Sequence, residues 1–519
     1  MEPLSLQNCY AGKRILLTGA SGFVGKVWLA MMLAKFPELG KCYVLIRPKK
    51  TLSAVERFEE LLGRSPAFRP LHQQWGEGLN DFLRDRLEVL EGDVSMPNLG
   101  LAPELSRRLH SEVDLIVHCA GLVDFEPDLR EAVAANVNGT MHALAFAKSC
   151  RRAAFLHVST AFVCGRTRGE FVAETLKRNF VPNGADYDVE AEYREVLQQT
   201  QTEEKRRDWV EQGQERARRW GWPNAYTYTK SMAESLILNR AGDLPYAILR
   251  PSIVESALDF PFPGWNEGAE TCTPISYLAG SWLRHITARP KLTLDIVPVD
   301  TVCRGIAVAG AALLAGRHRP VYHCASSYRN ALSVGRMLEL IDLAHRIHYR
   351  EHGTSPLERL LLSRWDAVAV TEQSPFAVDK LKELATQLSA ATKKWEAKAS
   401  DRVKAWIHPL TVFANQSKWT LIKAEKIIQV FLPFIYENNF RFVTENLAAH
   451  RVVESEFQFR PEAIDWRDYI LNIHEPGVRR WCYPILESKP VETDAHPYAV
   501  RLAREPKAIS EPRVSGRAR

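Results

Sequence analysis

Long apolar runs are missing from this sequence. No stretch reaches the roughly 18 consecutive apolar residues that a membrane-spanning helix needs, and the chain opens without the basic and apolar pattern of a secretory signal. The nine cysteines are odd in number and scattered, without a C-x-x-C pair. Such cysteine usage is typical of a reducing compartment, so we expect a soluble cytoplasmic protein.

A strong charge of one sign is also missing from the body of the chain. The net charge is +6, and residues 501–519 contribute +4 of it, from six Lys or Arg against two acids. The near-neutral remainder argues against a nucleic-acid binder. With 519 residues, 46% of them hydrophobic, the chain can bury large cores, and we expect two or more domains.

Hydrolase signatures have little support. No G-x-S-x-G elbow occurs. The stretch HYREH at residues 348–352 fits the H-x-x-E-H pattern of zinc peptidases, but it stands next to Gly353, where a helix should end. Arg346 and Arg350 beside it would disfavour a dication, so we expect no metal site.

A glycine-rich turn is the first feature that points to chemistry. Residues 15–25, ILLTGASGFVG, are typical of a buried strand that ends at Thr18 and leads through a turn into a helix. Gly19 would make the tight turn, Gly22 would let the backbone approach a pyrophosphate, and Gly25 would let the helix close on the strand. The N-terminus of the helix would present free N–H groups to the phosphates. The three glycines alone are a weak signal, which gains weight from the strands and polar residues later in the chain.

Strands and helices alternate up to about residue 165. Apolar residues recur at helical spacing over residues 23–36. Unbroken apolar runs predict further strands at residues 42–47, 87–90, 115–119 and 155–158. Such runs between helices predict a parallel sheet covered on both faces.

The ends of these strands carry candidate nucleotide ligands. The second strand ends at Arg47, where an NAD-binding chain usually has an acid that holds the ribose 2′-OH. A guanidinium suits a 2′-phosphate instead, with a solvated basic turn as the alternative. Asp93, after the third strand, could accept from an adenine amino group. The small residues Ala120 and Gly121, after the fourth, would let a dinucleotide pass close.

Four further side chains are candidates for ligand binding and proton transfer. The fifth strand delivers Ser159 and Thr160 to the carboxyl edge of the sheet, where open α/β sheets bind ligands. Tyr226 and Lys230 follow the pattern Y-x-x-x-K, which places them on one face of a helix. An ammonium one turn away should lower the pKa of the phenol from about 10, so that Tyr226 can exchange a proton near neutral pH.

The stretches TGASGFVG, HVSTAFV, GWPNAYTYTK and LRPSIVESAL together resemble the extended short-chain dehydrogenases/reductases, and more narrowly the bacterial alcohol-forming fatty acyl-CoA reductases. The resemblance covers residues 12–328 and resumes over residues 436–486. It implies an α/β fold: a Rossmann-type doubly wound parallel sheet with a mostly helical C-terminal substrate lobe. Two positions depart from the pattern, since Gly121 replaces an alanine and Cys164 stands where an asparagine is common.

The resemblance also implies roles for individual residues. Thr160, Tyr226 and Lys230 correspond to the catalytic trio, and Arg47, helped by Arg57, to the site of the 2′-phosphate. The other cofactor-binding positions, which Tyr226 and Lys230 complete, are Thr18, Gly19, Ser21, Gly22, Phe23, Val24, Gly25, Asp93, Val94, Cys119, Ala120, Gly121, Ser159, Pro251 and Ile253.

We divide the chain into an NADPH-binding domain at residues 1–330, a helical C-terminal region at 331–490 and a basic, disordered tail at 491–519. The first includes a helical insertion at 183–222 and a substrate segment at 256–290. The insertion is interpreted as one or two amphipathic helices packed on the core, with a cap over the active site as the alternative.

Two shorter elements carry their own predictions. Residues 406–434 are apolar at helical spacing, with Pro433 ending or kinking the helix. Core packing is the default interpretation of this segment, and an acyl-tunnel wall or a membrane-docking surface is the alternative. Asp300 is predicted to be the N-cap of a helix.

Together these features predict an NADPH-dependent reductase that converts long-chain fatty acyl-CoA to a primary alcohol through an aldehyde. The resemblance supplies the substrate class, and the residues supply the chemistry. One alternative is a reductase that stops at the aldehyde or acts on another carbonyl, such as a sterol ketone. The other is a non-catalytic NADPH-binding scaffold. The expected partners are fatty acyl-CoA and fatty aldehyde, with peripheral membrane contact through the C-terminal lobe.

Overall fold

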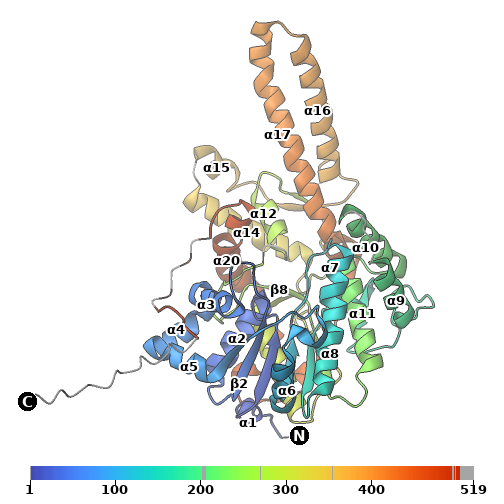
Figure 1. Ribbon diagram of the computed structural model, residues 1–519. Coiled ribbons are helices and arrows are strands. Elements are labelled where there is room, and N and C mark those ends of the chain that lie inside the picture. Colours follow the sequence, from blue (N-terminus) through green and yellow to red (C-terminus); the bar gives the residue numbers. More distant parts are fainter. Residues whose placement is uncertain are drawn as a thin grey trace, which may run out of the picture.

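A computed structural model of the chain describes residues 2–200, 206–268, 271–353, 355–491, 493, 496 and 498–502. Its body is built on a central sheet flanked by helices, from which a long helical hairpin projects (Figure 1). Within these ranges, no helix is both long and apolar enough to cross a membrane.

Seven strands, all parallel, form the central sheet in the order β3-β2-β1-β4-β5-β7-β11. The chain starts at β1, runs outward to β3 and returns to the other side of β1, which creates a switch point between β1 and β4. The predicted doubly wound sheet is therefore confirmed. The strands are β1 (Arg14–Thr18), β2 (Lys41–Ile46), β3 (Leu87–Glu91), β4 (Leu115–His118), β5 (Ala154–Val158), β7 (Tyr246–Pro251) and β11 (Val321–Cys324).

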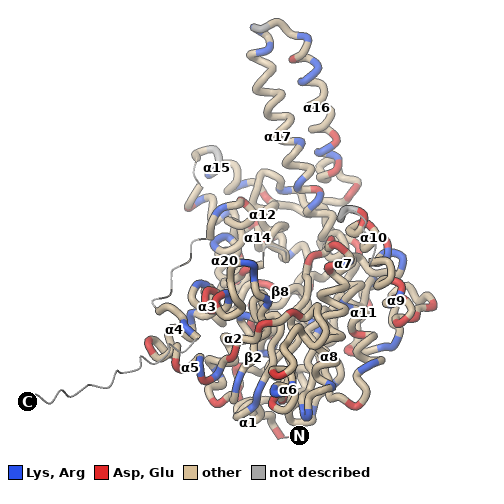
Figure 2. Tube along the Cα trace, viewed as in Figure 1, with Lys and Arg blue, Asp and Glu red and all other residues tan. Residues whose placement is uncertain are grey.

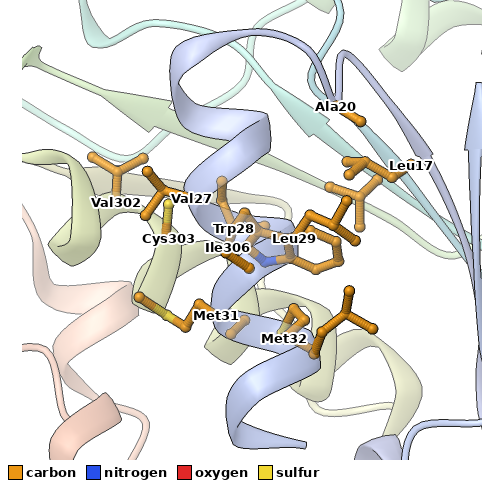
Figure 3. Packing of buried hydrophobic residues seen from close by; sticks show 14 of the residues in the cluster. Leu17, Ala20, Val27, Trp28, Leu29, Met31, Met32, Val302, Cys303 and Ile306 are labelled. Atoms are coloured by element: carbon orange, nitrogen blue, oxygen red, sulfur yellow. The ribbon is translucent and has the colours of Figure 1, made fainter. Parts of the chain in front are cut away.

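Both faces of this sheet are covered, which is why its strands are apolar throughout. Successive side chains of a strand point to opposite faces, so Ile15 and Leu17 of β1 belong to one core and Leu16 to the other. On the first face, Trp28 of α2 packs near Ile306 of α13 (Figure 3). The helices on that face include α1 (Leu6–Tyr10), α2 (Phe23–Lys35) and α13 (Val299–Leu314), and those on the second include α6 (Pro103–Glu112), α8 (Gly139–Ser149) and α11 (Ala225–Arg240).

The local patterns locate these elements well, because each predicted boundary of the first five strands and of α2 lies within one residue of the observed one. The prediction for Asp300 is wrong. Pro298 is the N-cap of α13, and Asp300 lies inside the first turn. Its buried carboxylate accepts hydrogen bonds from the backbone N–H groups of residues 258–260, so it holds the substrate segment to α13 instead of capping the helix.

The predicted insertion forms two helices, α9 (Val189–Gln199) and α10 (Arg206–Trp220), while residues 201–205 lie outside the described ranges. The two helices pack on the core beside α11, as their amphipathic pattern predicts. The Tyr228 hydroxyl of α11 donates to Glu192 Oε1 at 2.6 Å, and Arg216 of α10 pairs with the same carboxylate at 2.7 Å.

The C-terminal region is mostly helical, as predicted. Its elements include α14 (Val334–His352), α15 (Pro356–Leu361), β12 (Val368–Val370), α16 (Val378–Lys398), α17 (Asp401–Leu432), β13 (Asn439–Phe442), α18 (Glu445–Ala448), α19 (Trp466–Asp468), α20 (Glu475–Trp481) and α21 (Tyr483–Leu486). Helix α14 ends next to Gly353, as expected. Helix α17 ends at Leu432, where Pro433 begins a π-helical turn.

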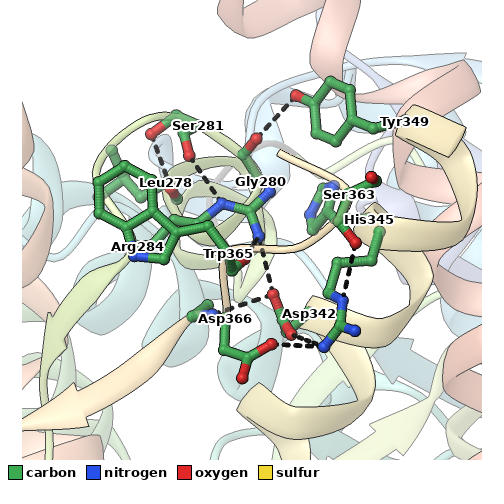
Figure 4. Close-up of polar contacts among 12 residues, drawn as sticks. Leu278, Gly280, Ser281, Arg284, Asp342, His345, Tyr349, Ser363, Trp365 and Asp366 are labelled. Atoms are coloured by element: carbon green, nitrogen blue, oxygen red, sulfur yellow. Dashed lines mark hydrogen bonds and ion pairs between the residues drawn. The ribbon is translucent and has the colours of Figure 1, made fainter. Parts of the chain in front are cut away.

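A buried ion pair joins this region to the substrate segment, which holds α12 (Thr273–Gly280) and β9 (His285–Thr287). The fully buried Arg284 donates to Asp342 Oδ1 of α14 at 2.9 Å and to the Ser281 carbonyl at 3.3 Å. The Tyr349 hydroxyl donates to the Gly280 carbonyl at 2.7 Å (Figure 4). These contacts fix α14 against α12.

Short elements complete the body: α3 (Ala54–Arg64), α4 (Arg69–Trp75), α5 (Leu79–Arg86), α7 (Leu129–Ala132), β6 (Arg168–Val172), β8 (Ile253–Glu255) and β10 (Ile296–Pro298). Strands β8 and β10 pair in parallel, as do β9 with β12 and β6 with β13.

Part of the predicted tail is ordered. Val500 is buried, and the Leu502 backbone N–H donates to Glu59 Oε1 at 2.6 Å. The imidazole of His496 stacks on His72 with ring centroids 3.9 Å apart. These residues lie against α3 and α4, so the expected disorder does not apply to them, because their apolar and polar groups find partners on the nucleotide half. Residues 503–519 lie outside the described ranges.

Candidate active site

The turn between β1 and α2 has the geometry that its glycines predict. Gly19 has a φ of +80°, and a Cβ atom there would lie 2.6 Å from the Ala120 backbone nitrogen. A Cβ on Gly25 would lie 2.1 Å from the Gly19 carbonyl oxygen, so a side chain fits at neither position. Ser21 and Gly22 are exposed, and Gly22 is the N-cap of α2. This leaves the N-terminus of a 13-residue helix accessible to a phosphate.

The end of β4 lies directly beside this turn. The Thr18 hydroxyl accepts a hydrogen bond from the Ala120 backbone N–H at 3.2 Å, which ties β1 to the segment Cys119–Ala120–Gly121. A Cβ on Gly121 would lie 3.0 Å from Asn136 Oδ1. The departure from the family pattern at Gly121 therefore has a local cause, because an alanine would have to displace Asn136 by a few tenths of an ångström.

The predicted 2′-phosphate site lies at the ends of β2 and β3. Arg47 is exposed, and its Nη1 is 3.6 Å from Asp93 Oδ2. Arg57 of α3 donates from Nη1 to the Arg47 carbonyl at 2.6 Å, so both arginines are at this edge. Burial raises the pKa of Asp93, but hydrogen bonds from Ser95 and the charge of Arg47 outweigh it and leave that pKa below its usual value. Val94 is half-buried against Gly139 of α8.

Ser159 and Thr160 follow β5 at the same edge of the sheet. The backbone N–H of Ser159 donates to the Leu249 carbonyl at 2.8 Å, while its buried hydroxyl has no hydrogen-bond partner among the described residues. The Thr160 hydroxyl is 3.5 Å from the Pro251 carbonyl at the end of β7, and Ile253 begins β8 just beyond.

The predicted catalytic trio comes together here. Tyr226 and Lys230 lie in the first turns of α11, whose N-cap is Asn224. The Tyr226 hydroxyl is hydrogen-bonded to Thr160. The Lys230 ammonium donates to the Val158 carbonyl at 2.7 Å and lies 3.4 Å from His157 Nε2. Helix α11 thus delivers residues that lie 66 and 70 positions after Thr160 in the chain to the end of β5.

The titration behaviour of the pair differs from the prediction. Burial raises the pKa of Tyr226 well above its usual value, with the Thr160 hydrogen bond opposing it. The prediction of a lowered pKa is wrong, because the Lys230 ammonium is engaged by Val158 and His157 and not by the phenol. Burial also lowers the pKa of Lys230 to about 8, although Cys119 and Glu234 act in the opposite direction.

Sequence reasoning missed three buried polar residues behind the site. His118 Nδ1 is 2.8 Å from the Thr18 hydroxyl, and its ring stacks on His157 with centroids 5.4 Å apart. Burial lowers the pKa of His118 to about 3 and that of His157 well below its usual value, so both imidazoles are neutral at pH 7. Asn136 accepts from the Leu122 backbone N–H at 2.8 Å. The available signal was a histidine inside two otherwise apolar strands, LIVH and AFLHV.

An aromatic cluster leads from Tyr226 toward the C-terminal lobe. Phe125, in the loop after β4, has its ring centroid 6.1 Å from that of Tyr226, 6.3 Å from Phe431 and 5.6 Å from Phe434. Phe162, two residues after Thr160, meets Phe434 edge-on at 4.9 Å. The apolar path beside the phenol is therefore built by elements from both halves of the chain.

A small apolar cavity lies beyond this cluster, with a volume of about 20 Å³. It is about the size of one water molecule, so a longer ligand could enter only if the walls moved apart. The walls come from α12, β9, α14 and the end of α17, and the residues that line it include Ile275, Ala288, Val334, Met337, Phe431 and Ile435.

The residues at the carboxyl edge of the sheet fit a dinucleotide carrying a nicotinamide. The glycine turn offers backbone N–H groups to a pyrophosphate, Arg47 offers a fork of donors to a phosphate, and the unpartnered Ser159 hydroxyl offers a donor beside the Lys230 ammonium. The Thr160 and Tyr226 hydroxyls are positioned to donate to one oxygen atom, the arrangement that stabilises a developing oxyanion.

Comparison with known proteins finds relatives that cover most of the chain. The family described as Male sterility protein, an NAD-binding domain, matches residues 17–306. An alcohol-forming fatty acyl-CoA reductase of Simmondsia chinensis is 30% identical over 490 residues, covering 90% of this chain and 96% of the relative. The chloroplastic fatty acyl-CoA reductase 2 of Arabidopsis thaliana is 29% identical over 505 residues, covering 92% and 80%.

Among solved structures, the reductase domain of a nonribosomal peptide synthetase from Mycobacterium tuberculosis superposes with a TM-score of 0.52. The two chains are 20% identical, and the match covers 90% of this chain and 91% of that one. This likeness shows the fold alone. With a family match over more than half its length and relatives that span nearly all of it, the chain belongs to the fatty acyl-CoA reductases, a family of oxidoreductases that use a nicotinamide cofactor.

Proposed function

We propose that this protein reduces long-chain fatty acyl-CoA to the primary alcohol with two molecules of NADPH, through an aldehyde. The observation that carries the proposal is the convergence of Thr160, Tyr226 and Lys230 beside the glycine turn, with an apolar path leading away from the phenol. The names of the relatives support the substrate class and the alcohol product.

NADPH, when bound, supplies a hydride to the carbonyl carbon of the thioester. The Thr160 and Tyr226 hydroxyls donate hydrogen bonds to the carbonyl oxygen as negative charge develops on it, each worth roughly 3–4 kcal/mol in such sites. A phenol whose pKa is raised by burial suits this role, since it stays protonated at neutral pH. The hemithioacetal then expels CoA thiolate and leaves the aldehyde.

The second reduction uses the same donors. Tyr226 gives its proton to the alkoxide oxygen as the alcohol forms, and solvent returns a proton to the phenolate. The Lys230 ammonium, held by the Val158 carbonyl, would donate to the ribose hydroxyls of the cofactor and so fix its position. His157 and Asn136 are positioning residues. His157 contacts the Lys230 ammonium, and Asn136 contacts the backbone of Leu122 after β4, so neither contacts the reacting atoms.

Alcohol and aldehyde products are distinguished by stoichiometry. With palmitoyl-CoA, the alcohol-forming reaction consumes two NADPH for each CoA released, whereas a reductase that stops at the aldehyde consumes one. A scaffold without catalysis releases no CoA at all. Measuring NADPH absorbance and free thiol in the same sample gives both quantities, and the absence of CoA release under conditions where NADPH binds would overturn the proposal.

We place the acyl chain along the aromatic cluster and into the apolar cavity. Each CH₂ removed from water contributes about 0.8 kcal/mol, so a long chain needs an apolar channel. The nucleotide half has both sheet faces covered, and the cavity is lined by Phe431, whose ring centroid lies 6.3 Å from that of Phe125. Trp419 and Ile427 belong to the apolar segment 406–434, for which a tunnel wall was one interpretation, but they do not line the cavity.

Ala288→Leu tests this placement. A leucine side chain at this wall should take the place of about two CH₂ groups of the acyl chain, which corresponds to roughly 1.6 kcal/mol and about a 15-fold loss in kcat/KM for palmitoyl-CoA. Octanoyl-CoA should be affected much less, and the affinity for NADPH should be unchanged. Ala279→Leu is the matched control, since Ala279 is buried in the same core but does not line the cavity. Equal losses for both chain lengths in Ala288→Leu would place the acyl chain elsewhere.

The lowered pKa of Lys230 predicts a pH dependence. The ammonium is charged below its pKa of about 8 and loses its charge above it, so kcat/KM for NADPH, which reports the free enzyme, should fall about tenfold per pH unit above pH 8. Lys230→Arg keeps the charge at high pH and should remove this decline if the variant folds. A wild-type profile that stays level to pH 10 would contradict the assignment.

A further inference from the structure

The hairpin of α16 and α17 has small side chains between its two helices and large apolar side chains on its outer surface. The two helices have 21 and 32 residues, so each is at least about 30 Å long, and they extend away from the body (Figure 1). They meet through small residues: Ala385, Ser389, Thr392, Thr411 and Ala414 are all buried there. Only the end of α17 belongs to the body, where Ile428 and Phe431 join the C-terminal core.

The large apolar side chains of the hairpin point outward instead. Trp406 is 83% exposed, Phe413 69%, Trp395 62% and Leu410 60%. Leu384, Leu388 and Trp419 are also more than half exposed. Trp406, Leu410 and Phe413 are spaced four and three residues apart, so they share one face of α17. Single exposed apolar residues are common on soluble proteins, but such a set on one face marks a surface that a membrane or another molecule covers. Half or more of the surface of each of these side chains is therefore not used to hold the two helices together.

Basic residues surround this apolar surface. Residues 393–418 carry six Lys or Arg against two acids, and one of those acids, Glu396, is bound to His408 at 2.7 Å. Lys393, Lys394, Lys398 and Arg402 are exposed around the free end, and Figure 2 shows basic residues toward that end of both helices. The Lys418 ammonium lies 5.6 Å above the Trp419 ring.

Tryptophan beside lysine and arginine is the composition of helices that lie in the headgroup region of anionic bilayers. The indole rings occupy the interface, and the cations pair with lipid phosphates. Contact with a second copy of this chain would instead oppose like charges at the same place. No helix of the described chain can cross a bilayer, so the chemistry fits a surface contact.

We propose that the α16–α17 hairpin is a membrane-docking element whose outer side chains bind the headgroup layer of an anionic phospholipid bilayer. If the proposed function holds, docking also has a use for the substrate, since α17 runs without interruption from the docked end to Phe431 in the cavity wall. Docking itself does not depend on that function.

Vesicle binding tests the proposal with the full-length protein. We expect the wild type to float with vesicles of phosphatidylcholine and phosphatidylglycerol, to bind pure phosphatidylcholine vesicles at least tenfold more weakly, and to be released partly by salt. The triple variant Trp406→Ser, Leu410→Ser, Phe413→Ser and the triple variant Lys393→Glu, Lys398→Glu, Arg402→Glu should each bind the mixed vesicles at least tenfold more weakly. Val453→Ser with Ile485→Ser, exposed apolar residues away from the hairpin, should bind like the wild type.

Two further readouts make each outcome decisive. NADPH oxidation with palmitoyl-CoA without vesicles should be unchanged in both triple variants, and its absence in the wild type would overturn the proposed function without affecting the docking result. Light scattering measures the mass of each protein in solution. A wild type that ignores mixed vesicles, or apolar variants that bind them normally, would overturn docking. So would a wild-type oligomer that the Trp406 variant dissociates while vesicle binding is absent.

Discussion

Tyr226→Phe should lose about 10²- to 10⁴-fold in turnover on both palmitoyl-CoA and the corresponding aldehyde, since general acid catalysis contributes on that order. The substitution removes one hydroxyl that is hydrogen-bonded to Thr160 and leaves the ring contact with Phe125 in place. Folding and NADPH affinity should therefore persist, as measured by thermal unfolding and by fluorescence of the bound cofactor.

Tyr228→Phe is the matched control for this variant. Tyr228 lies on the same helix, two residues away, and its hydroxyl donates to Glu192 at 2.6 Å on the far side from Thr160. Its loss should lower stability and leave the rate intact. Lys230→Ala should abolish most turnover by itself, and the Tyr226→Phe, Lys230→Ala double variant should be little worse than either single one, because residues that act as a unit are not additive. Near-normal rates in Tyr226→Phe would contradict the mechanism.

Arg47→Ala should raise the KM for NADPH by roughly 10- to 150-fold. A charge-assisted hydrogen bond contributes about 1.5–3 kcal/mol, which corresponds to that range of affinity. Arg57, which contacts the Arg47 carbonyl, stays at the edge and can retain part of the attraction. The KM for NADH should change little, since NADH has no 2′-phosphate, and initial rates with each cofactor measure both values.

Two variants distinguish the contribution of the paired N–H donors of Arg47 from that of its positive charge. Arg47→Lys keeps the charge but loses the planar pair of donors, so its KM should fall between those of the wild type and Arg47→Ala. Lys50→Ala removes an exposed base three residues away and should have no such effect. A wild type that uses NADH as well as NADPH would show that Arg47 selects no phosphate.

Local sequence patterns alone were enough to predict the strands, the glycine turn and the Y-x-x-x-K helix of the nucleotide half. The spacing of Gly19, Gly22 and Gly25, the apolar runs and the Y-x-x-x-K helix each depend on neighbours within one or two turns of chain. Such signals survive without knowledge of the rest of the fold. The alternation of strand and helix likewise predicts a parallel sheet covered on both faces, but the order of the strands around β1 came from the structure.

The pKa values and polar contacts of the site residues could not be predicted from local sequence patterns. The pKa of Tyr226 depends on how far the phenol is buried and on where the Lys230 ammonium points, and the Val158 carbonyl decides the latter. His157 and Asn136 reach the site from a strand and a helix that are distant in sequence. The Asp300 carboxylate likewise accepts from backbone N–H groups of a loop some forty residues earlier, in addition to pairing with Arg304 of its own helix.

The sequence by itself therefore determined the sheet and the cofactor turn, because both are encoded in short-range spacing, whereas the candidate catalytic trio was identified through the resemblance of these motifs to a family. Only the tertiary structure decided how the apolar stripe of residues 406–434 is used. Its C-terminal end at Phe431 enters the core and the cavity wall, whereas Trp406 and Phe413 stay exposed. The same helical spacing of apolar residues continues through the buried and the exposed part of α17. The two parts differ in burial because the C-terminal end packs against the walls of the cavity, whereas the other end contacts only the small residues of α16.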